Sequence, residues 1–266
     1  MKKIPNEKLL RLSTLWPEVE ILEEDADILA VNKPAGLLVA PDIRDKSPEN
    51  LMGLIHSGIK LQRPWARQHD LHYVTNVHRL DAGTSGIVLM ARSKPVLINL
   101  ARQFHDRHPK MTYLALVCGA LPTPEMEVNL PLAPNLARPE LMAVDRGRGK
   151  SAITRFTRVE SFKKYSLIKV EPLTGRFHQI RAHLKEIGCP LVSDTDYGNG
   201  FPLLLSQLKR DYRMKPEGER PLMARPALHA ERLEIVHPTT GLPLLLEAPW
   251  PKDFTVSVKY LRKFAG

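Results

Sequence analysis

Short segments in which apolar and polar side chains alternate recur along this chain, and they limit its fold more than any other feature. A two-residue hydrophobic period is typical of strands that bury one face of a sheet. Ile87, Leu89 and Ala91 follow this period. Further strands are predicted in the segments "ILAVNKP", "MTYLALVCG", "SAITRFTRVESF", "YSLIKVEPL" and "ERLEIVHP". The sequence therefore predicts a chain built mainly around β-sheet.

Helical spacing of apolar residues is confined to three places. Ser93 is a suitable N-cap for a helix with Pro95 in its first turn. A second helix is predicted after Thr174, which is a possible cap, and is expected to stop at Gly188. A third is predicted over residues 253–264. Strands outnumber helices and their connections are irregular. This predicts an α+β fold with a mixed, mostly antiparallel central sheet flanked by helices and loops.

The charge balance favours a polyanionic partner. Lysine and arginine number 39 against 29 acidic residues, so the formal net charge is +10. Nucleic acid ranks ahead of a membrane surface, although a merely basic enzyme has the same composition. The two cysteines form no CxxC pair, which fits a reduced, cytoplasmic setting. We expect no signal peptide, because the first residues lack an apolar run, and no segment long enough to span a bilayer.

A polar cluster interrupts the sheet pattern just before the strand that contains Ile87. The stretch "NVHRLDAGTSG" holds His78, Arg79, Asp81 and Thr84 beside glycines. A solvent-facing aspartate at such a place is usually a turn former. The density of charged and hydroxyl groups favours a reaction centre instead, because a fixed carboxylate can act as a nucleophile or a base.

A second polar cluster lies in "LTGRFHQIRAHL", residues 173–184. Arg176 is expected in the first helical turn, and His178, Arg181 and Lys185 are expected to share one helix face. Such a face is usually only solvated. At a helix N-terminus it also favours an anion, either a phosphate or the carboxylate of Asp81.

A basic block extends over residues 136–169. It contains nine basic and three acidic residues, which leaves +6 of the net charge in this segment. The simpler interpretation is that these residues lie on solvated strand faces. The more specific one is that they form a surface that binds RNA phosphates. The histidines give little support for a metal: His69, His72 and His78 have no cysteine near them in sequence. His178 and His183 fall on different helix faces.

Six segments of the chain resemble, in order, the motifs of the RluA-type pseudouridine synthases. They are "VNKPAGLLV", "HRLDAGTSG", "TYLALVCG", "LTGRFHQIRAHL", "PLVSDTDYG" and "ALHAERLEIVHPTTG". The resemblance implies the pseudouridine synthase fold and an enzyme that isomerises uridine in ribosomal or transfer RNA to pseudouridine. It also implies catalysis without a cofactor or metal. We expect a cytoplasmic monomer that binds RNA and no membrane.

The resemblance also implies a role for each matching residue. Asp81 would be the catalytic aspartate, Tyr113 would stack on the uracil, and Arg181 would pair with the Asp81 carboxylate. Arg79 would help to displace the target base, and Ile180 would line the pocket. The remaining residues expected to contact the RNA or the base are His78, Thr84, Arg176 and His178.

The expected domain organisation is an N-terminal tail or short helix at residues 1–18, a catalytic domain at 19–258 and a C-terminal end at 259–266. The tail is too short to form the S4 RNA-binding domain that many relatives carry. After the Lys-Pro-Ala-Gly turn at 33–36 a second short strand is expected. Ala82 replaces the basic residue that often follows the family's aspartate, and residues 200–226 are longer than the usual link.

Two other functions compete with this one. A non-catalytic RNA-binding or RNA-remodelling protein would share the fold and the charge, but it would have no need for Asp81, Tyr113 and Arg181 together. A carboxylate-dependent nucleoside hydrolase would need a second acid near Asp81 or a metal site, and the sequence offers neither clearly.

Overall fold

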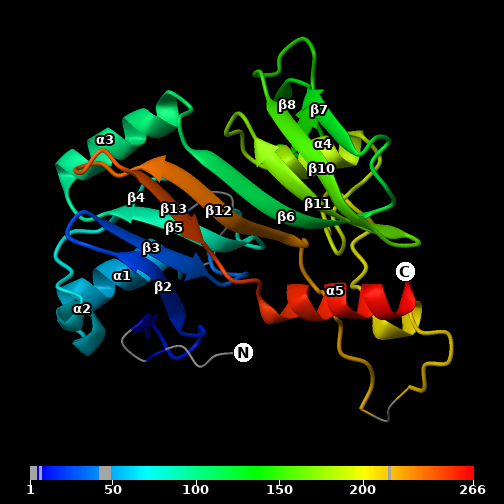
Figure 1. Ribbon diagram of the computed structural model, residues 1–266, viewed down its shortest axis with the longest axis horizontal. Helices are drawn as coiled ribbons and strands as arrows, with labels where there is room; N and C mark the ends of the chain where they lie inside the picture. Colours follow the sequence, from blue (N-terminus) through cyan, green and yellow to red (C-terminus); the bar gives the residue numbers. More distant parts are fainter. Residues whose placement is uncertain (1–4, 6–7, 42–48, 215–216) are drawn as a thin grey trace. The chain divides into compact units, whose positions relative to one another are not determined.

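The computed structural model describes Pro5 and residues 8–41, 49–214 and 217–266, which are arranged as two units (Figure 1). Unit 1 takes in Met1–Met111 and Ala230–Pro249, and unit 2 takes in Thr112–His229 and Trp250–Gly266. The chain passes from one unit to the other three times: within strand β6 (Lys110–Cys118), within strand β12 (Leu228–Val236), and between Pro249 and Trp250. Each unit is therefore assembled from segments that lie far apart in the sequence.

Unit 1 is a sheet in which β1, β2, β3 and β5 are successive neighbours and pair antiparallel. Strand β4 also pairs with β5, and β13 pairs with β12. The elements of this unit besides β6 and β12 are β1 (Leu9–Leu10), β2 (Val19–Glu24), β3 (Ile28–Lys33), α1 (Leu51–Lys60), α2 (Pro64–Gln68), β4 (Thr75–Asn76), β5 (Ser85–Ala91), α3 (Lys94–His105) and β13 (Pro243–Glu247).

Helix α3 covers one face of the unit 1 sheet (Figure 1). Ser93 is its N-cap, and the Ser93 hydroxyl accepts a hydrogen bond from the backbone N–H of Val96 at 3.4 Å, as the sequence predicts. The buried side of the helix, which includes Leu100, packs on Ile87 and Leu89 of β5. Every residue of β5 is buried, so this strand is the centre of the unit 1 core.

Gly86 occupies the closest backbone approach in unit 1. Its φ is +116°, and a Cβ built at this position would lie 2.2 Å from the carbonyl oxygen of Ala230 in β12. Only glycine combines this backbone conformation with such an approach. The glycine in "GTSG" therefore allows the neighbouring strand to pack directly against the start of β5.

Unit 2 contains a second run of antiparallel neighbours in the order β6, β11, β10, β7. Strands β8 and β9 form a separate two-stranded sheet. The elements of this unit besides β6 and β12 are β7 (Glu125–Asn129), β8 (Leu132–Pro134), β9 (Met142–Val144), β10 (Ile153–Ser161), β11 (Tyr165–Pro172), α4 (Gln179–Glu186), the 3₁₀ helix η2 (Leu205–Gln207) and α5 (Lys252–Phe264).

The two helices of unit 2 cover opposite faces of its sheet. Leu114 and Leu116 of β6 pack in the core that contains α5, whereas Ala115 and Val117 pack in the core that contains α4. This division follows from the alternation of side chains along a strand. Unit 2 is thus a three-layer arrangement with the α4 layer and the α5 layer separated by the sheet.

The predicted α+β class and mostly antiparallel sheet are confirmed, as are the strands and the helices that begin near Ser93 and Lys252. Two predictions are wrong. The short strand expected after the turn at 33–36 is only a single bridge between Leu38 and Asn50. Within the predicted tail, Leu9–Leu10 forms β1 and pairs with β2, whereas residues 1–4 and 6–7 lie outside the described residues.

Helix α1 was not predicted from the sequence. The Asn50 side chain caps it by accepting from the backbone N–H of Gly53 at 2.9 Å. Gly58 is required because a Cβ there would lie 2.0 Å from the Trp65 ring. Two glycines in ten residues weaken the helical signal, and only the packing of Trp65 explains one of them. Within the described residues, no helix combines the length and apolar character needed to cross a membrane.

We predict that Gly86→Ala lowers the free energy of unfolding by about 2–4 kcal/mol, because the new methyl group collides with the backbone of β12. Gly119→Ala is a matched control, since Gly119 also has positive φ (+81°) but no atom within 4 Å of the place that a Cβ would occupy. Strain alone predicts a cost of about 1–2 kcal/mol there. Urea unfolding of both variants measures the difference, and equal losses would contradict the proposed collision.

Candidate active site

The loop between β4 and β5 carries the first polar cluster, and the imidazole of His78 holds it to the sheet. The His78 Nε2 accepts a hydrogen bond from the backbone N–H of Leu89 at 3.1 Å, and the ring stacks on Phe104 with centroids 5.2 Å apart. Burial lowers the pKa of His78 to about 4. His78 is therefore neutral at physiological pH and satisfies a strand N–H. Its expected contact with RNA stays a prediction.

Asp81 lies in a turn whose backbone is fixed from two sides. The N–H of Thr84 donates to the Asp81 carbonyl at 3.0 Å, and the N–H of Gly36 donates to the Ala82 carbonyl at 2.7 Å. Thr84 is buried, Asp81 is half-buried and Arg79 is exposed. Asp81 is thus partly accessible on a backbone held by hydrogen bonds, while the threonine contributes to the packing of the turn.

Lys33, for which the sequence predicts no role, connects this turn to the Lys-Pro-Ala-Gly segment. Its side chain is fully buried, and its ammonium group donates to the carbonyls of Leu37 (2.7 Å), Pro34 (2.9 Å) and Ala82 (3.2 Å). A buried ammonium is stable only when its donors are satisfied. Lys33 therefore links two segments 49 residues apart directly behind Asp81.

Helix α4 carries the second polar cluster, and it begins later than predicted. Its first residue is Gln179, and the N-cap His178 has a left-handed backbone conformation with φ 49°. The prediction that Thr174 caps the helix and that Arg176 lies in its first turn is wrong, because the left-handed residue interrupts helical geometry before Gln179. The Arg176 side chain instead donates to the Ser151 carbonyl at 3.0 Å.

A buried network of polar side chains replaces the missing cap. The Gln179 oxygen accepts from the Thr174 hydroxyl (2.8 Å), and its amide donates to Thr154 Oγ1 (2.9 Å). Thr154 in turn bonds His183 Nδ1 at 2.9 Å, while His183 Nε2 bonds the Leu130 carbonyl. Burial lowers the pKa of His183, which keeps the ring neutral. Both of its nitrogens are engaged within the fold, so His183 has a structural role.

Arg181 is buried and forms a two-pronged ion pair with Asp194. The Arg181 Nε and Nη2 atoms donate to the two Asp194 carboxylate oxygens at 2.8 and 2.7 Å, and Nη2 also donates to Asp196 at 2.8 Å. Burial raises the pKa of Asp194, but the hydrogen bonds and charge of Arg181 outweigh it and hold that pKa below its ordinary value. The planar guanidinium is therefore fixed in orientation.

His178 and Tyr197 complete the surroundings of Arg181. Arg181 Nη1 lies 3.0 Å from His178 Nε2, and His178 Nδ1 lies 3.0 Å from the Tyr197 hydroxyl. An arginine can only donate, so Nε2 is the acceptor and Nδ1 carries the proton toward Tyr197. The Arg181 guanidinium also lies over the Tyr197 ring, 4.8 Å from its centroid, with Lys185 at 6.0 Å. Arg181 and Lys185 share a face of α4 as predicted, whereas His178 precedes the helix and reaches Arg181 from the N-cap position.

Tyr113 and Ile180 lie on the same side of the unit 2 sheet. Tyr113 of β6 and Ile180 of α4 belong to one apolar cluster, in which Ile180 is buried and Tyr113 is half-buried. Tyr113, Ile180 and Arg181 all belong to unit 2, whereas Asp81, Arg79 and His78 belong to unit 1. The pairing of Arg181 with Asp81 stays a prediction. Asp194, Asp196 and Tyr197 were missed, although all three stand in the quoted motif "PLVSDTDYG".

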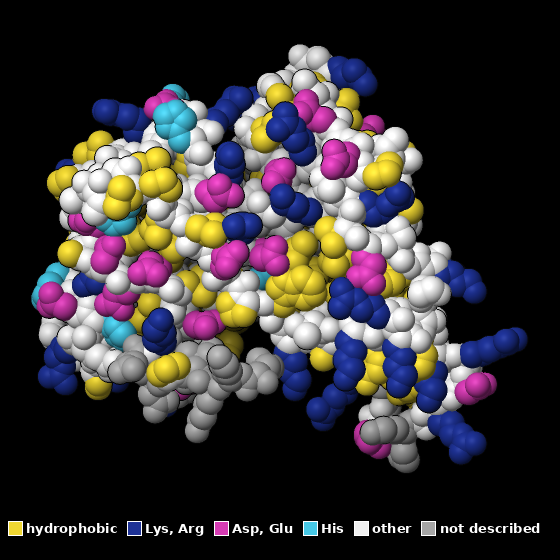
Figure 2. All heavy atoms as spheres, in the orientation of Figure 1, with side chains coloured by type: hydrophobic (Ala, Val, Ile, Leu, Met, Phe, Trp, Pro, Cys, Tyr) yellow, Lys and Arg dark blue, Asp and Glu magenta, His cyan; other side chains and the backbone are white. Residues whose placement is uncertain are grey.

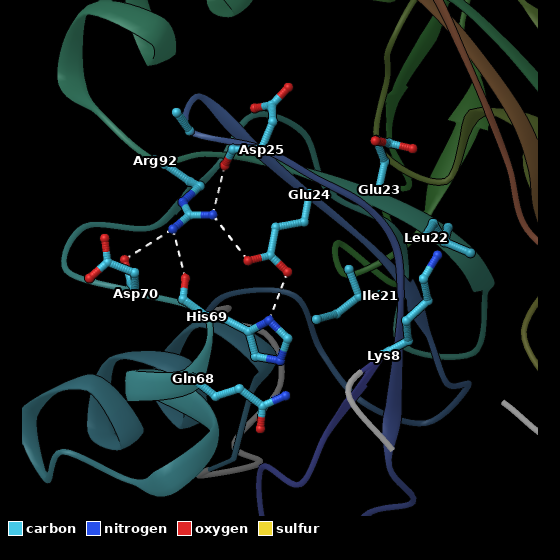
Figure 3. A pocket seen from close by; sticks show the side chains of 11 residues that line it. Lys8, Ile21, Leu22, Glu23, Glu24, Asp25, Gln68, His69, Asp70 and Arg92 are labelled. Carbon is cyan, nitrogen blue, oxygen red and sulfur yellow. Dashed lines mark hydrogen bonds and ion pairs between the residues drawn. The ribbon is translucent and has the colours of Figure 1, made fainter. Parts of the chain in front are cut away.

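A hollow of about 560 Å³ also lies in unit 1 (Figure 3). Arg92 spans its wall and donates to Glu24 and to the carbonyls of Asp25, His69 and Asp70. His69 Nδ1 bonds the same Glu24 at 2.8 Å. Four acidic residues line the hollow against two basic ones, which disfavours an RNA phosphate there.

One group of side chains in the described chain has the spacing of metal ligands. Asp25, Asp27 and His237 place candidate ligand atoms within 4.8 Å of one another. His237 Nε2 already bonds Asp25 at 2.8 Å, and the other Asp25 oxygen accepts two backbone N–H groups. The group is therefore a hydrogen-bonded turn, and none of the predicted site residues belongs to it.

Comparison with known proteins shows the family. A family model described as RNA pseudouridylate synthase matches residues 27–186, more than half of the chain. "Ribosomal large subunit pseudouridine synthase D" of Neisseria meningitidis serogroup B is 34% identical over 262 residues, covering 98% of this chain and 66% of that protein. "Uncharacterized RNA pseudouridine synthase YhcT" of Bacillus subtilis is 34% identical, covering 90% and 70%.

The fold agrees with this result. The solved structure titled "Human RNA Pseudouridylate Synthase Domain Containing 4" matches with a TM-score of 0.69 and 22% identity, over 91% of this chain and 92% of that one. "Human RNA Pseudouridylate Synthase Domain Containing 1" matches with a TM-score of 0.63 and 23% identity, over 88% and 84%. The chain belongs to the RNA pseudouridylate synthase family, whose enzymes are isomerases, and the predicted resemblance is confirmed. It spans about two thirds of the length of the curated relatives named above.

We predict that Asp194→Asn lowers the free energy of unfolding by about 3–5 kcal/mol, because it leaves the buried Arg181 without its paired charge. Asp196→Asn is the matched control: its side chain is 32% exposed, so a loss below about 1 kcal/mol is expected.

The pH dependence supplies a second measurement. The pKa of Asp194 is lowered in the folded protein, so its ionisation stabilises the fold above the ordinary aspartate pKa of about 3.9. That contribution disappears as the pH falls through the lower, folded-state value. Urea unfolding between about pH 3 and pH 7 should therefore show a weaker acid dependence for Asp194→Asn than for wild type. Parallel curves would contradict the assigned ion pair.

Proposed function

We propose that this protein isomerises specific uridines in RNA to pseudouridine, with Asp81 as the catalytic aspartate. The observation that carries the proposal is that the family match at 27–186 contains Asp81, Tyr113 and Arg181 together. The RNA is ribosomal or transfer RNA. Large-subunit ribosomal RNA is the first candidate, because a relative named for that subunit is 34% identical. We expect a cytoplasmic monomer that needs no cofactor.

The chemistry of the reaction matches these side chains. The N1–C1′ glycosidic bond breaks, the uracil turns, and a C5–C1′ bond forms while C5 loses its proton and N1 gains one. Asp81 attacks C1′ or C6, or removes a proton in a glycal route. A uridine in structured RNA must first leave its stack, and Arg79 would fill the gap. Tyr113 would stack on the base, which is worth about 1–3 kcal/mol.

Two features of the geometry support these roles. The Asp81 turn is held from behind by the buried Lys33 and from the side by Gly36, so a carboxylate there has little freedom. Arg181 is oriented by Asp194 before any substrate binds. A site that is rigid in advance loses less entropy in the transition state. In the proposed arrangement Arg181 also pairs with Asp81 and keeps the Asp81 carboxylate ionised.

Mapping pseudouridines in total RNA from cells with and without the gene tests the proposal directly. We expect one or a few positions in ribosomal or transfer RNA to lose the modification, and a plasmid copy of the gene to restore it. Purified protein should then modify a transcript that contains the same position. Identical pseudouridine maps in the two strains would overturn the proposed function.

We predict that Asp81→Asn abolishes isomerisation and leaves RNA affinity within a few fold of wild type. The amide keeps the shape of the side chain but has no negative charge with which to attack or to take a proton. Single-turnover pseudouridine formation and filter binding measure the two properties on one transcript. A normal rate in this variant would show that another residue is the nucleophile or base.

We predict that Arg181→Lys loses most activity while the protein stays folded. An ammonium group cannot meet both oxygens of the Asp194 carboxylate in one plane, as the guanidinium does. Arg181→Met should cost more, since it leaves Asp194 buried without a cation. Single-turnover rates against pH, with thermal melts of each variant, separate the effects. A wild-type rate for the lysine variant would contradict the planar pairing, and a loss that only follows the melting temperature would make Arg181 structural.

A further inference from the structure

The outer surface of α5 carries a group of exposed lysines that the candidate site does not use. The backbone N–H of Lys163 donates to the Ala265 carbonyl at 2.7 Å, which places the β10–β11 turn against the end of this helix. We call the exposed lysines of the helix and the turn the α5 face: Lys163, Lys164, Lys252, Lys259 and Lys263.

The charges of the α5 face are not neutralised within the fold. In the described part of the chain, none of its five lysines has a carboxylate within ion-pair distance. Lys163 and Lys164 belong to the basic block at 136–169, but several other basic side chains of that block are paired. These pairs are Arg138 with Glu140 and Asp196, Arg148 with Asp145, Arg155 with Glu127, and Lys169 with Glu171.

Two aromatic rings lie among these lysines. Tyr260 and Phe264 stack with centroids 6.0 Å apart and planes 10° from parallel, and both are half-buried. Lys263 lies over the Phe264 ring, 5.2 Å from its centroid. Half-exposed aromatic rings interleaved with cations are typical of surfaces that bind single-stranded nucleic acid, because bases stack on the rings while the cations meet phosphates.

The segment at 205–214 extends the same surface. Leu208 packs in the core cluster that contains Phe254 and Leu261 of α5, so this segment lies beside the helix. Figure 2 shows Lys and Arg side chains gathered around hydrophobic ones at the lower right, where α5 and this segment lie in Figure 1. The segment adds the exposed Lys209, Arg210 and Arg213.

Helix stability does not account for this arrangement. Cations in the last turn of a helix are favourable, which would explain Lys263. Lys252, however, is the first residue of α5, where a positive charge opposes the helix dipole. The distance from Lys252 to Lys263 along the helix is about 16 Å, enough for several phosphates of one strand. The lysines therefore fit an external polyanion better than an internal electrostatic need.

We propose that the α5 face binds the RNA substrate at a point remote from the reacting uridine. It lies in the α5 layer of unit 2, on the opposite side of the sheet from α4 and Arg181. The inference rests on the proposed function, since it assigns a second contact with the same RNA. Flanking single-stranded RNA meets the lysines through its phosphates and Tyr260 and Phe264 through a base.

The test compares two triple variants of the full chain that remove the same charge. One is Lys252→Gln, Lys259→Gln and Lys263→Gln on the α5 face, and the control is Lys60→Gln, Lys94→Gln and Lys110→Gln on exposed positions of unit 1. Binding to transcribed large-subunit ribosomal RNA is measured between about 50 and 200 mM salt. We expect the α5 variant to lose about tenfold in affinity and its log–log salt slope to fall by about 2.

Isomerisation provides the second readout. On the full transcript the α5 variant should raise KM and leave kcat unchanged, and on a short oligonucleotide around the target uridine it should behave as wild type. Tyr260→Leu, checked by thermal melts, should weaken binding of the transcript without changing the salt slope. Equal losses in the two triple variants, or no loss in either, would overturn the proposal. Weaker RNA binding by the α5 variant without isomerisation of any RNA would support the surface and refute the proposed function.

Discussion

The buried ion pair between Arg181 and Asp194 is the interaction on which the site in unit 2 depends. Asp194 has no exposed surface, and it also accepts the backbone N–H groups of Asp196 and Tyr197. One carboxylate therefore shapes the turn after α4 and orients the guanidinium on α4. Removing two charges from water is costly, so such a pair persists only when nearly every oxygen and N–H is satisfied. Tyr197 and His178 supply the remaining contacts around the arginine.

In each unit the predicted site residues are supported by buried polar groups rather than by apolar packing alone. In unit 1, Lys33 satisfies three carbonyls behind the Asp81 turn, and His78 satisfies a strand N–H at its beginning. In unit 2, Gln179 connects the start of α4 to β10. Such networks admit few alternative arrangements, because any displacement leaves a buried polar group without a partner. This rigidity would suit the proposed function, in which the site must hold a uracil accurately.

The positive charge of the chain is distributed unevenly between paired and unpaired positions. The block at 136–169 holds much of the formal excess, but several of its cations face carboxylates on neighbouring strands and turns. Surface pairs of this kind stabilise a fold little, yet they cancel the local field. No ion pair joins a carboxylate to a lysine of the α5 face in the described chain, although the neighbouring Arg262 of α5 pairs with Glu160. Counting charges along the sequence therefore shows which segments are rich in basic residues, but not which surface of the folded protein carries unpaired positive charge.

The sequence by itself determined strands β3, β5, β6, β10, β11 and β12 and helices α3 and α5, because hydrophobic period and helical spacing are local properties. The resemblance to a known family added the need of Arg181 for a carboxylate. The motif that contains Asp81 could likewise be recognised in the sequence, since its residues are contiguous. Only the tertiary structure decided that Asp194 is the partner shown for Arg181, and that α4 starts at Gln179 after a left-handed His178. It also decided the roles of Lys33 and Gly58. Lys33 donates a hydrogen bond to the Ala82 carbonyl, and Gly58 leaves room for the Trp65 ring. These choices depend on which groups meet in space, and a pattern of spacing along one chain does not contain that information.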